Sequence, residues 1–265
     1  MSDIKLDELQ WYFVAQENEW VASYGQYTLK SFFQPIYTQN IETIYGYECL
    51  IRVYLCNGRT ISPLDFFAYF LDEDELVKVG IVCAWLHIRN FAKLSLNGKV
   101  FINIHPNMFA CTQTIKNATS QIHNRICEEG LSSEQIIWEI TEFKESNVQK
   151  FIAGVEEFRQ LGHQLAIDDY GQQFSNDERV SLLKPDIVKI DRSLIQEFFG
   201  TTNATYLPEL LENFNQNGIC TVIEGIETKE EYERIKHLPF SLIQGYFTGK
   251  PYSMSCISNT NFTNF

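Results

Sequence analysis

Two adjacent carboxylates that follow a short apolar run are the feature of this sequence best suited to chemistry. Leu165, Ala166 and Ile167 lead directly into Asp168 and Asp169. A nearly continuous apolar run of this kind predicts a strand that is buried on both faces, as in a parallel sheet. Two neighbouring ionised carboxylates repel each other, so keeping both charged costs free energy unless a cation lies between them. An isolated pair of aspartates also fits a solvated loop, and the other strand ends decide between the two interpretations.

The same kinds of side chain recur where other apolar runs end. In a parallel barrel the C-terminal ends of the strands converge on one face, and catalytic residues collect there. Several carboxylates that meet with one amide and one lysine cannot all be satisfied by hydrogen bonds, and such oxygen-rich sets suit Mg²⁺ or Mn²⁺. With two ions about 3.5–4 Å apart, a set of this kind promotes in-line displacement at phosphorus. The side chains at the strand ends are Glu48, Asn103, Glu139, Glu142, Asp168, Asp169, Lys189, Asp191 and Glu224.

Other catalytic arrangements are absent from the sequence. It contains no G-x-S-x-G elbow and no Gly-rich phosphate loop, and its five histidines show no paired metal spacing. His105 follows a predicted strand and precedes a proline, where a lone histidine is more often structural than catalytic. Trp85 and Trp138 are interpreted as core residues, and Glu142 could also cap a helix or tether a loop.

Apolar runs and helical spacing alternate along the chain and predict the elements that carry these side chains. The predicted strands cover residues 32–37, 44–53, 100–106, 135–142, 164–171, 185–191, 219–224 and 241–247. The predicted helices cover residues 62–70, 73–96, 115–129, 148–161, 194–199, 208–217 and 230–237. Because strands and crossover-length helices alternate throughout, the sequence predicts a single α/β barrel.

The two ends of the chain lie outside this alternation. Four residues near the N-terminus have helical spacing and predict a short amphipathic helix, namely Leu6, Leu9, Tyr12 and Phe13. The C-terminal tail is polar and lacks a helical pattern, so either the closing helix is missing or the N-terminal helix takes over its role. The predicted helical extension, barrel and tail cover residues 1–25, 26–252 and 253–265.

Composition excludes several classes of protein. The chain has 265 residues, 45% of them hydrophobic, and a net charge of −13. Without a basic run, it is not expected to bind DNA or an anionic membrane directly. Seven cysteines without a C-x-x-C pair are typical of reduced thiols, and residues 1–8 do not resemble a signal peptide. The long apolar stretch at 76–94 contains four charged or histidine side chains, too many for a membrane span. We therefore expect a soluble, cytoplasmic protein.

The motifs together resemble those of the EAL domain family, the bacterial cyclic di-GMP phosphodiesterases. Tyr47-Glu48-Cys49-Leu50-Ile51-Arg52 is similar to the signature Glu-Ala-Leu-x-Arg of that family. The resemblance covers about residues 30 to 252, and although each motif alone is weak, so many in family order are specific. The further matching segments are Gln34-Pro35-Ile36, Asn103-Ile-His-Pro106, Trp138-Glu-Ile-Thr-Glu142, Asp168-Asp-Tyr-Gly171, Lys189-Ile-Asp191, Ile223-Glu-Gly-Ile-Glu-Thr228, Gln244-Gly-Tyr246 and Lys250-Pro251.

The resemblance implies a fold, a reaction and a cofactor. The fold would be a modified TIM-type (β/α)₈ barrel with one antiparallel strand. The reaction would be hydrolysis of cyclic di-GMP to linear pGpG by two-metal, in-line attack of water, with Mg²⁺ or Mn²⁺ as the two ions. One ion would be held by Glu48, Asn103, Glu139 and Asp168, and the second by Asp168 and Asp169, with Asp168 bridging. The family also implies a homodimer.

It also implies roles for residues around the metals. Lys189 would position and polarise the attacking water, Glu224 would orient the site or accept a proton, and Glu48 would join them as a catalytic residue. Glu142 would stabilise the loop after Asp169. The residues expected to bind substrate phosphate or guanine are Gln34, Leu50, Arg52, Asp191 and Gln244.

The sequence departs from the family at one loop in particular. Gln172 and Gln173 follow Gly171, where the family usually has Gly-Thr-Gly, so a glycine is lost at Gln173. In the family this loop couples dimer contacts to metal binding, so the change bears on rate and regulation. An alternative hypothesis is therefore a catalytically weak or inactive cyclic di-GMP receptor or protein-interaction module. A third is a phosphodiesterase for other nucleotides. Regulation would come from expression, from a protein partner or from residues 1–25.

Overall fold

The computed structural model describes residues 12–16, 18–112, 118–140, 148–171, 176–200 and 205–257. Glu142, Gln172 and Gln173 lie outside these described residues. The predictions about the tethering role of Glu142 and about the altered loop therefore remain predictions.

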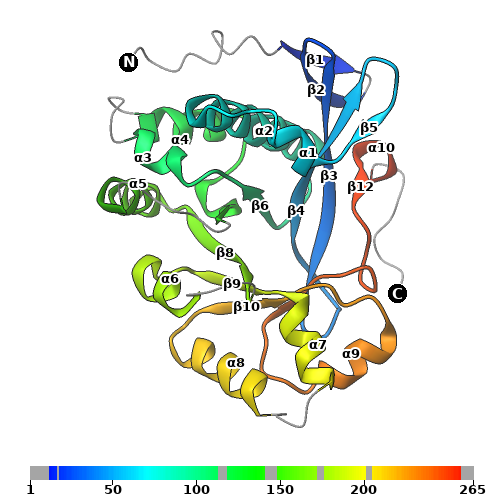
Figure 1. The fold of residues 1–265 in the computed structure, drawn as a ribbon, viewed down its shortest axis with the longest axis vertical. Helices are drawn as coiled ribbons and strands as arrows, with labels where there is room; N and C mark the ends of the chain where they lie inside the picture. The colour runs from blue at the N-terminus through cyan, green and yellow to red at the C-terminus, as the bar shows by residue number, and fades with distance from the viewer. Residues whose placement is uncertain are drawn as a thin grey trace.

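Eight strands close into a barrel (Figure 1). Going round it, β3 pairs with β11, then β10, β9, β8, β7, β6 and β4 follow, and β4 pairs back to β3. Strand β3 runs antiparallel to both of its neighbours, whereas the other pairs are parallel. The predicted fold class, a modified TIM-type barrel with one antiparallel strand, is confirmed. The strands are β3 (Tyr27–Thr38), β4 (Ile44–Leu55), β6 (Lys99–Asn103), β7 (Ile136–Ile140), β8 (Gln164–Tyr170), β9 (Ile187–Ile190), β10 (Cys220–Ile223) and β11 (Leu242–Ile243).

Helices connect the parallel strands and cover the outside of the barrel (Figure 1). The longest is α2, where the Asp72 side chain accepts hydrogen bonds from the first backbone amides and Ser95 ends the helix in a left-handed conformation. Among the helices around the barrel, α3 and α6 were not predicted from the sequence. The helices are α1 (Pro63–Phe67), α2 (Glu73–Leu94), α3 (Asn107–Thr112), α4 (Ala118–Glu128), α5 (Val148–Gln160), α6 (Asn176–Leu183), α7 (Arg192–Gly200), α8 (Tyr206–Gln216) and α9 (Lys229–Ile235).

An apolar layer fills the barrel interior below the C-terminal strand ends. It takes one buried side chain from each of seven strands, and Tyr45 of β4 packs against it. Since side chains alternate between the two faces of a strand, the residues two positions further along point into the same interior, nearer the open end. Those positions hold Asn103, Glu139, Asp168, Lys189, Glu224 and Gln244. The seven residues of the apolar layer are Ile36, Phe101, Ile137, Ala166, Ile187, Val222 and Leu242.

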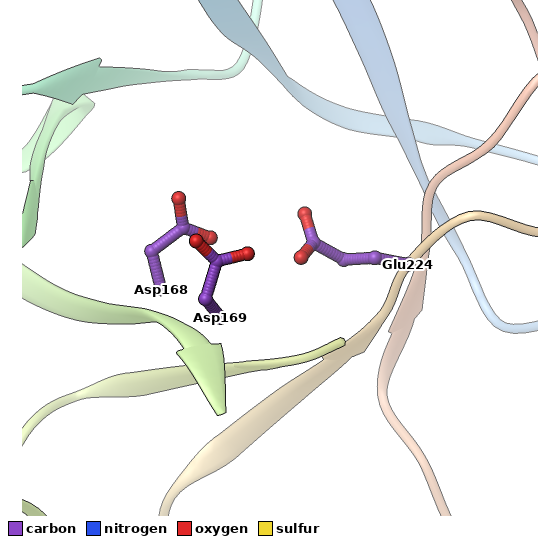
Figure 2. A group of neighbouring side chains, drawn as sticks. All are labelled: Asp168, Asp169 and Glu224. Atoms are coloured by element: carbon purple, nitrogen blue, oxygen red, sulfur yellow. The ribbon is translucent and has the colours of Figure 1, made fainter. Parts of the chain in front are cut away.

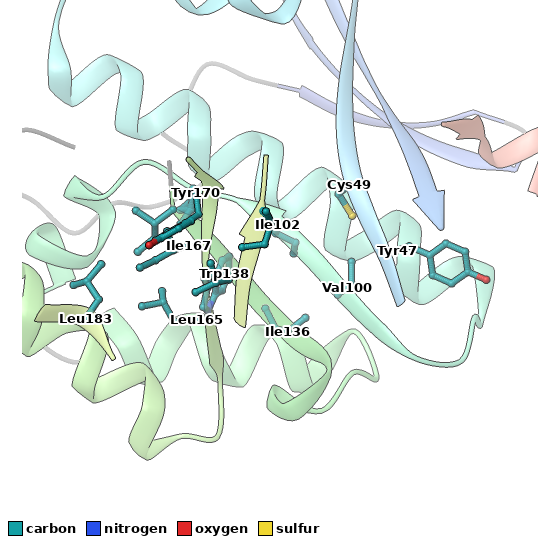
Figure 3. Packing of buried hydrophobic residues seen from close by; sticks show 14 of the residues in the cluster. Tyr47, Cys49, Val100, Ile102, Ile136, Trp138, Leu165, Ile167, Tyr170 and Leu183 are labelled. Atoms are coloured by element: carbon teal, nitrogen blue, oxygen red, sulfur yellow. The ribbon is translucent and has the colours of Figure 1, made fainter. Parts of the chain in front are cut away.

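The outward-facing residues of the same strands form the main core with the helices (Figure 3). Trp138, Ile102 and Leu165 are examples, each buried between the barrel and the surrounding helices. Trp138 packs edge-to-face against Phe158 of α5, with ring centroids 5.7 Å apart. Trp138 is thus a core residue, as predicted, and so is Trp85 on α2.

The N-terminal segment forms a hairpin, so the predicted helix is wrong for residues 12–24. Strands β1 (Tyr12–Gln16) and β2 (Glu19–Tyr24) pair antiparallel, and β2 extends the sheet at β3. Asn90 on α2 helps to stabilise a strand here rather than a helix, because its side-chain amide donates to Trp20 O (2.9 Å) and accepts from Trp20 N (2.7 Å). Those backbone groups would be internally bonded in a helix. Leu6 and Leu9 lie outside the described residues.

The C-terminal tail is also more ordered than its polar composition suggests. Strand β12 (Tyr252–Ser253) pairs with β3, and a short helix, α10 (Met254–Ile257), follows it. Met254 is buried in the main core, which supplies an apolar anchor that the sequence pattern did not reveal. A short strand, β5 (Thr60–Ile61), was likewise not predicted. Residues 258–265 lie outside the described part of the chain, and the exact domain boundaries remain predictions.

Acid should destabilise the fold through His87. Its ring is buried on α2 with Nδ1 2.9 Å from Ser31 Oγ, and burial lowers the pKa of His87 from 6.5 to about 3. Between these two pH values the unfolded chain binds a proton that the folded chain does not. The contribution of the neutral His87 ring to the free energy of unfolding is therefore fully present above pH 6.5 and is lost progressively below it. At pH 5 the loss is about 2 kcal/mol. Urea unfolding at pH 7 and pH 5 measures it.

The matched variant for this prediction is His87→Asn, which keeps a polar atom near Ser31 but cannot titrate. The difference in unfolding free energy between wild type and variant should change by about 2 kcal/mol between the two pH values. Parallel pH profiles for the two proteins would show that His87 is not responsible.

Candidate active site

Lys189 lies at the centre of the carboxylates that end the barrel strands. Its Nζ is 2.8 Å from Glu224 Oε1, 2.9 Å from Glu139 Oε1, 3.1 Å from Asp168 Oδ1 and 3.6 Å from Glu48 Oε2. The lysine is 1% exposed and Glu139 is fully buried. One ammonium group is therefore shared among four carboxylates that water hardly reaches.

The charges at this site are unbalanced. Burial by itself lowers the pKa of Lys189, but the surrounding carboxylates outweigh it and hold this pKa well above its usual range. Burial raises the pKa of Glu139 strongly and that of Glu224 to about 8, although Lys189 acts in the opposite direction on both. Burial, and then the charge of Asp168, raises the pKa of Asp169 to about 6. Burial is the main cause of the raised pKa values, and the charges of the neighbouring carboxylates, which outnumber the single ammonium group, add to it.

Two amide side chains orient the carboxylates. Asn103 Nδ2 donates to Glu139 Oε2 (3.1 Å) and to Glu48 Oε1 (3.4 Å). Gln244 Nε2 donates to the other oxygen of Glu48 at 2.6 Å, across the closed barrel from β11 to β4. Glu48 thus has both oxygens engaged, and its position depends on residues from distant parts of the chain.

Asp168 and Asp169 both turn toward the site because the end of β8 is irregular. Neighbouring residues of a regular strand point to opposite faces. Here the pairing of β8 with β9 shifts register between Ile167 and Tyr170, and Asp169 has a left-handed backbone with φ of 55°. Figure 2 shows the two carboxylates side by side, with Glu224 extending toward them from the end of β10.

The oxygen atoms at this site fit a hard divalent cation. Asp168, Asp169 and Glu224 each offer a carboxylate oxygen, and the three oxygens lie within 4.8 Å of one another. Asp168 Oδ1 and Glu139 Oε1 have Lys189 as their close partner, and the buried Gln244 Oε1 accepts no hydrogen bond within the described structure. Carboxylate and amide oxygens are the donors that Mg²⁺ and Mn²⁺ prefer. The prediction from the sequence gave Glu224 a catalytic role only, whereas the structure groups it with the two aspartates.

Three of the remaining predicted residues lie on the paired strands β3 and β4. Gln34 Nε2 donates to Gly249 O (3.1 Å), and Arg52 lies on β4 with its guanidinium 5.2 Å from the Phe32 ring. Leu50 and Arg52 follow Glu48 at two-residue steps, so they share a face of β4 and lead away from the carboxylates.

Asp191 has a structural contact in addition to its place near the site. Its Oδ1 accepts a hydrogen bond from Ser193 N (2.8 Å) at the start of α7. Its charge also contributes to the raised pKa of Asp169, after burial and Asp168. The site roles assigned to Gln34, Leu50, Arg52, Asp191 and Gln244 remain predictions.

Comparison with known proteins identifies a relative by sequence and solved structures with the same fold. Probable cyclic di-GMP phosphodiesterase PdeI of Escherichia coli K12 is 26% identical over 267 residues, which cover 96% of this chain and 32% of PdeI. The chain thus spans about a third of the length of that relative. The solved structure of a standalone versatile EAL protein from Vibrio cholerae O395, in its c-di-GMP bound form, is 27% identical with a TM-score of 0.72, covering 85% of this chain and 93% of that one.

A second solved structure has the same fold at lower identity. Klebsiella pneumoniae BlrP1, in a manganese and cy-diGMP complex, has a TM-score of 0.74 and 22% identity, covering 94% of this chain and 62% of that one. No helix among the described residues is both long and apolar enough to cross a membrane.

The family described as EAL domain matches residues 18–251, which include all the site residues discussed above. The resemblance seen in the sequence is confirmed, and the chain belongs to the EAL domain family.

Proposed function

We propose that this protein hydrolyses cyclic di-GMP to linear pGpG with the help of two divalent metal ions. The observation that carries the proposal is the group of five carboxylates, Glu48, Glu139, Asp168, Asp169 and Glu224, gathered near a single buried ammonium group. Membership of the EAL domain family and a relative named as a probable cyclic di-GMP phosphodiesterase support it. Solved structures of similar fold with the dinucleotide bound support the choice of substrate.

The metals would be Mg²⁺ or Mn²⁺. Glu48, Asn103, Glu139, Asp168 and Asp169 would hold them, and the position of Glu224 suits a further ligand. When bound, the ions supply a water molecule of lowered pKa and offset the charge of the phosphate. Gln244 and Asn103 keep Glu48 oriented for this task through their hydrogen bonds.

Lys189 and Glu224 would act on the reacting groups directly. The reaction adds a water oxygen to phosphorus and breaks the bond to the 3′-oxygen, which leaves as a hydroxyl after taking up a proton. The ammonium group of Lys189 is held protonated and donates hydrogen bonds, so it would position the water and stabilise charge on the phosphate. Glu224, 2.8 Å from Lys189, would hold or accept the proton that the water loses.

The substrate would extend from the carboxylates along the paired strands β3 and β4. Gln34 faces Glu48 across this ladder, and Arg52 lies four residues further along β4. Arg52 suits a phosphate or the guanine edge because its guanidinium offers several donors in one plane. Leu50 and Asp191 would complete the contacts to the base. A homodimer is a further proposal that rests on the family. A cytoplasmic location and a regulatory protein partner are proposals that rest on the sequence analysis.

A chromatographic assay tests the proposed function. Purified protein is incubated with cyclic di-GMP and Mn²⁺ or Mg²⁺, and parallel samples contain EDTA. We expect pGpG to accumulate with metal and not with EDTA. If the substrate survives while calorimetry shows that it binds, the receptor hypothesis replaces the enzyme. A chain that cleaves other cyclic or linear dinucleotides equally well would support the third hypothesis.

A further inference from the structure

Tyr170 links the strained end of β8 to helix α6. Its hydroxyl donates a hydrogen bond of 2.5 Å to Asp177 Oδ1, in the first turn of α6. Its ring is 2% exposed and packs edge-to-face on Phe214 of α8, with centroids 5.3 Å apart. Tyr170 directly follows Asp169, so whatever fixes Tyr170 also constrains the backbone of that aspartate.

The backbone around Asp169 needs such a constraint. Asp169 has φ of 55°, a conformation that a residue other than glycine retains only when its surroundings determine it. On its C-terminal side Tyr170 O accepts a hydrogen bond from Asp191 N (3.0 Å). Gly171 follows with φ of 110°, and a Cβ there would lie 2.4 Å from Leu194. The chain therefore leaves the strand along one narrow path, with the Tyr170 side chain as its outer anchor.

The Tyr170 hydroxyl is suited to be a permanent donor. A tyrosine hydroxyl is protonated at neutral pH and can donate, whereas the carboxylate oxygen of Asp177 accepts. A hydrogen bond between a buried donor and a charged acceptor is among the stronger kinds in proteins. The Tyr170–Asp177 hydrogen bond also connects residues on the two sides of segment 172–175, where the sequence departs from its family.

We propose that the Tyr170–Asp177 hydrogen bond is a positioning contact that holds Asp169 in its left-handed conformation and thereby raises the affinity of the site for a divalent cation. Tyr170 and Asp177 touch neither the cation nor the substrate, so they are positioning residues. The inference rests on the proposed function only in taking Asp169 as a metal ligand. Partners that orient a ligand without touching the metal commonly change metal affinity by about 10–100-fold when they are removed.

Calorimetric titration with Mn²⁺ tests this proposal. Tyr170→Phe removes the hydroxyl and keeps the ring against Phe214, and it should raise the Kd for Mn²⁺ about tenfold or more. Asp177→Asn keeps an uncharged acceptor and should raise the Kd less. Tyr232→Phe is the matched control, because it removes a hydrogen bond from a tyrosine of α9 to Gln39 O (3.1 Å), which is not a residue of the candidate active site, and should leave the Kd unchanged.

The outcomes separate this inference from the proposed function. An unchanged Kd in Tyr170→Phe with a lowered melting temperature would show a purely structural contact and would overturn the proposal, as would equal losses in Tyr170→Phe and Tyr232→Phe. If wild type binds Mn²⁺ but leaves cyclic di-GMP intact, the proposed function fails while the comparison of Kd values still decides the role of Tyr170. If wild type binds no Mn²⁺, both are overturned.

Discussion

Asp168→Asn should abolish the hydrolysis of cyclic di-GMP, lowering the rate by about a thousandfold or more. The substitution keeps the size of the side chain and removes its charge. Asp168 contacts Lys189 at 3.1 Å and shares the three-carboxylate group with Asp169 and Glu224, so its charge acts on both the lysine and the proposed metal site. Chromatography of pGpG formed at saturating Mn²⁺ measures the effect, and calorimetry measures the accompanying loss of metal affinity.

The matched control for this prediction is Glu156→Gln. It also removes one carboxylate charge, from an exposed ion pair with Arg159 on α5, and should leave the rate unchanged. A residual rate above about a tenth of wild type in Asp168→Asn would be incompatible with a bridging role for this carboxylate, since such a role predicts a loss of several kcal/mol.

Lys189→Met should destabilise the metal-free protein by about 3–5 kcal/mol, because the buried carboxylates lose the ammonium group that they share. Added Mn²⁺ should recover most of this stability, since the ions supply the missing positive charge, whereas hydrolysis should stay lost without a donor to position the water. Urea unfolding with EDTA and with Mn²⁺ gives the two free energies. The effect is large because Lys189 is 1% exposed and lies within 3.6 Å of four carboxylates.

The exposed pair of Lys236 and Glu233 provides the comparison for this second prediction. Lys236→Met removes a lysine from a surface ion pair of 2.6 Å, and the midpoint of urea unfolding should stay unchanged with or without metal. If Mn²⁺ fails to restore the free energy of unfolding of Lys189→Met, the carboxylates do not hold the ions as proposed.

The order of the elements and the chemistry of the strand ends could be predicted from the sequence. The apolar runs that end in Glu139, in Asp168 and Asp169, and in Lys189 fall in strands β7, β8 and β9. They could be recognised because a strand buried on both faces needs a continuous apolar run, and a charged residue interrupts such a run visibly. The N-terminal hairpin could not be recognised in this way. Its short aromatic run fits both the spacing of a helix and the alternation of a strand. The hydrogen bonds that favour the strand come from Asn90, 70 residues away.

The sequence by itself determined that Glu139, Asp168, Lys189 and Glu224 lie toward the C-terminal ends of neighbouring strands, because each of them interrupts or ends a local apolar run that can be recognised along the chain. Only the tertiary structure decided how they meet. Barrel closure brings Gln244 to within 2.6 Å of Glu48, 196 residues earlier, and puts Lys189 among four carboxylates. The left-handed backbone at Asp169 likewise depends on the register of β8 against β9 and on the anchoring of Tyr170. Contacts of this kind depend on packing between distant segments, which no local pattern encodes.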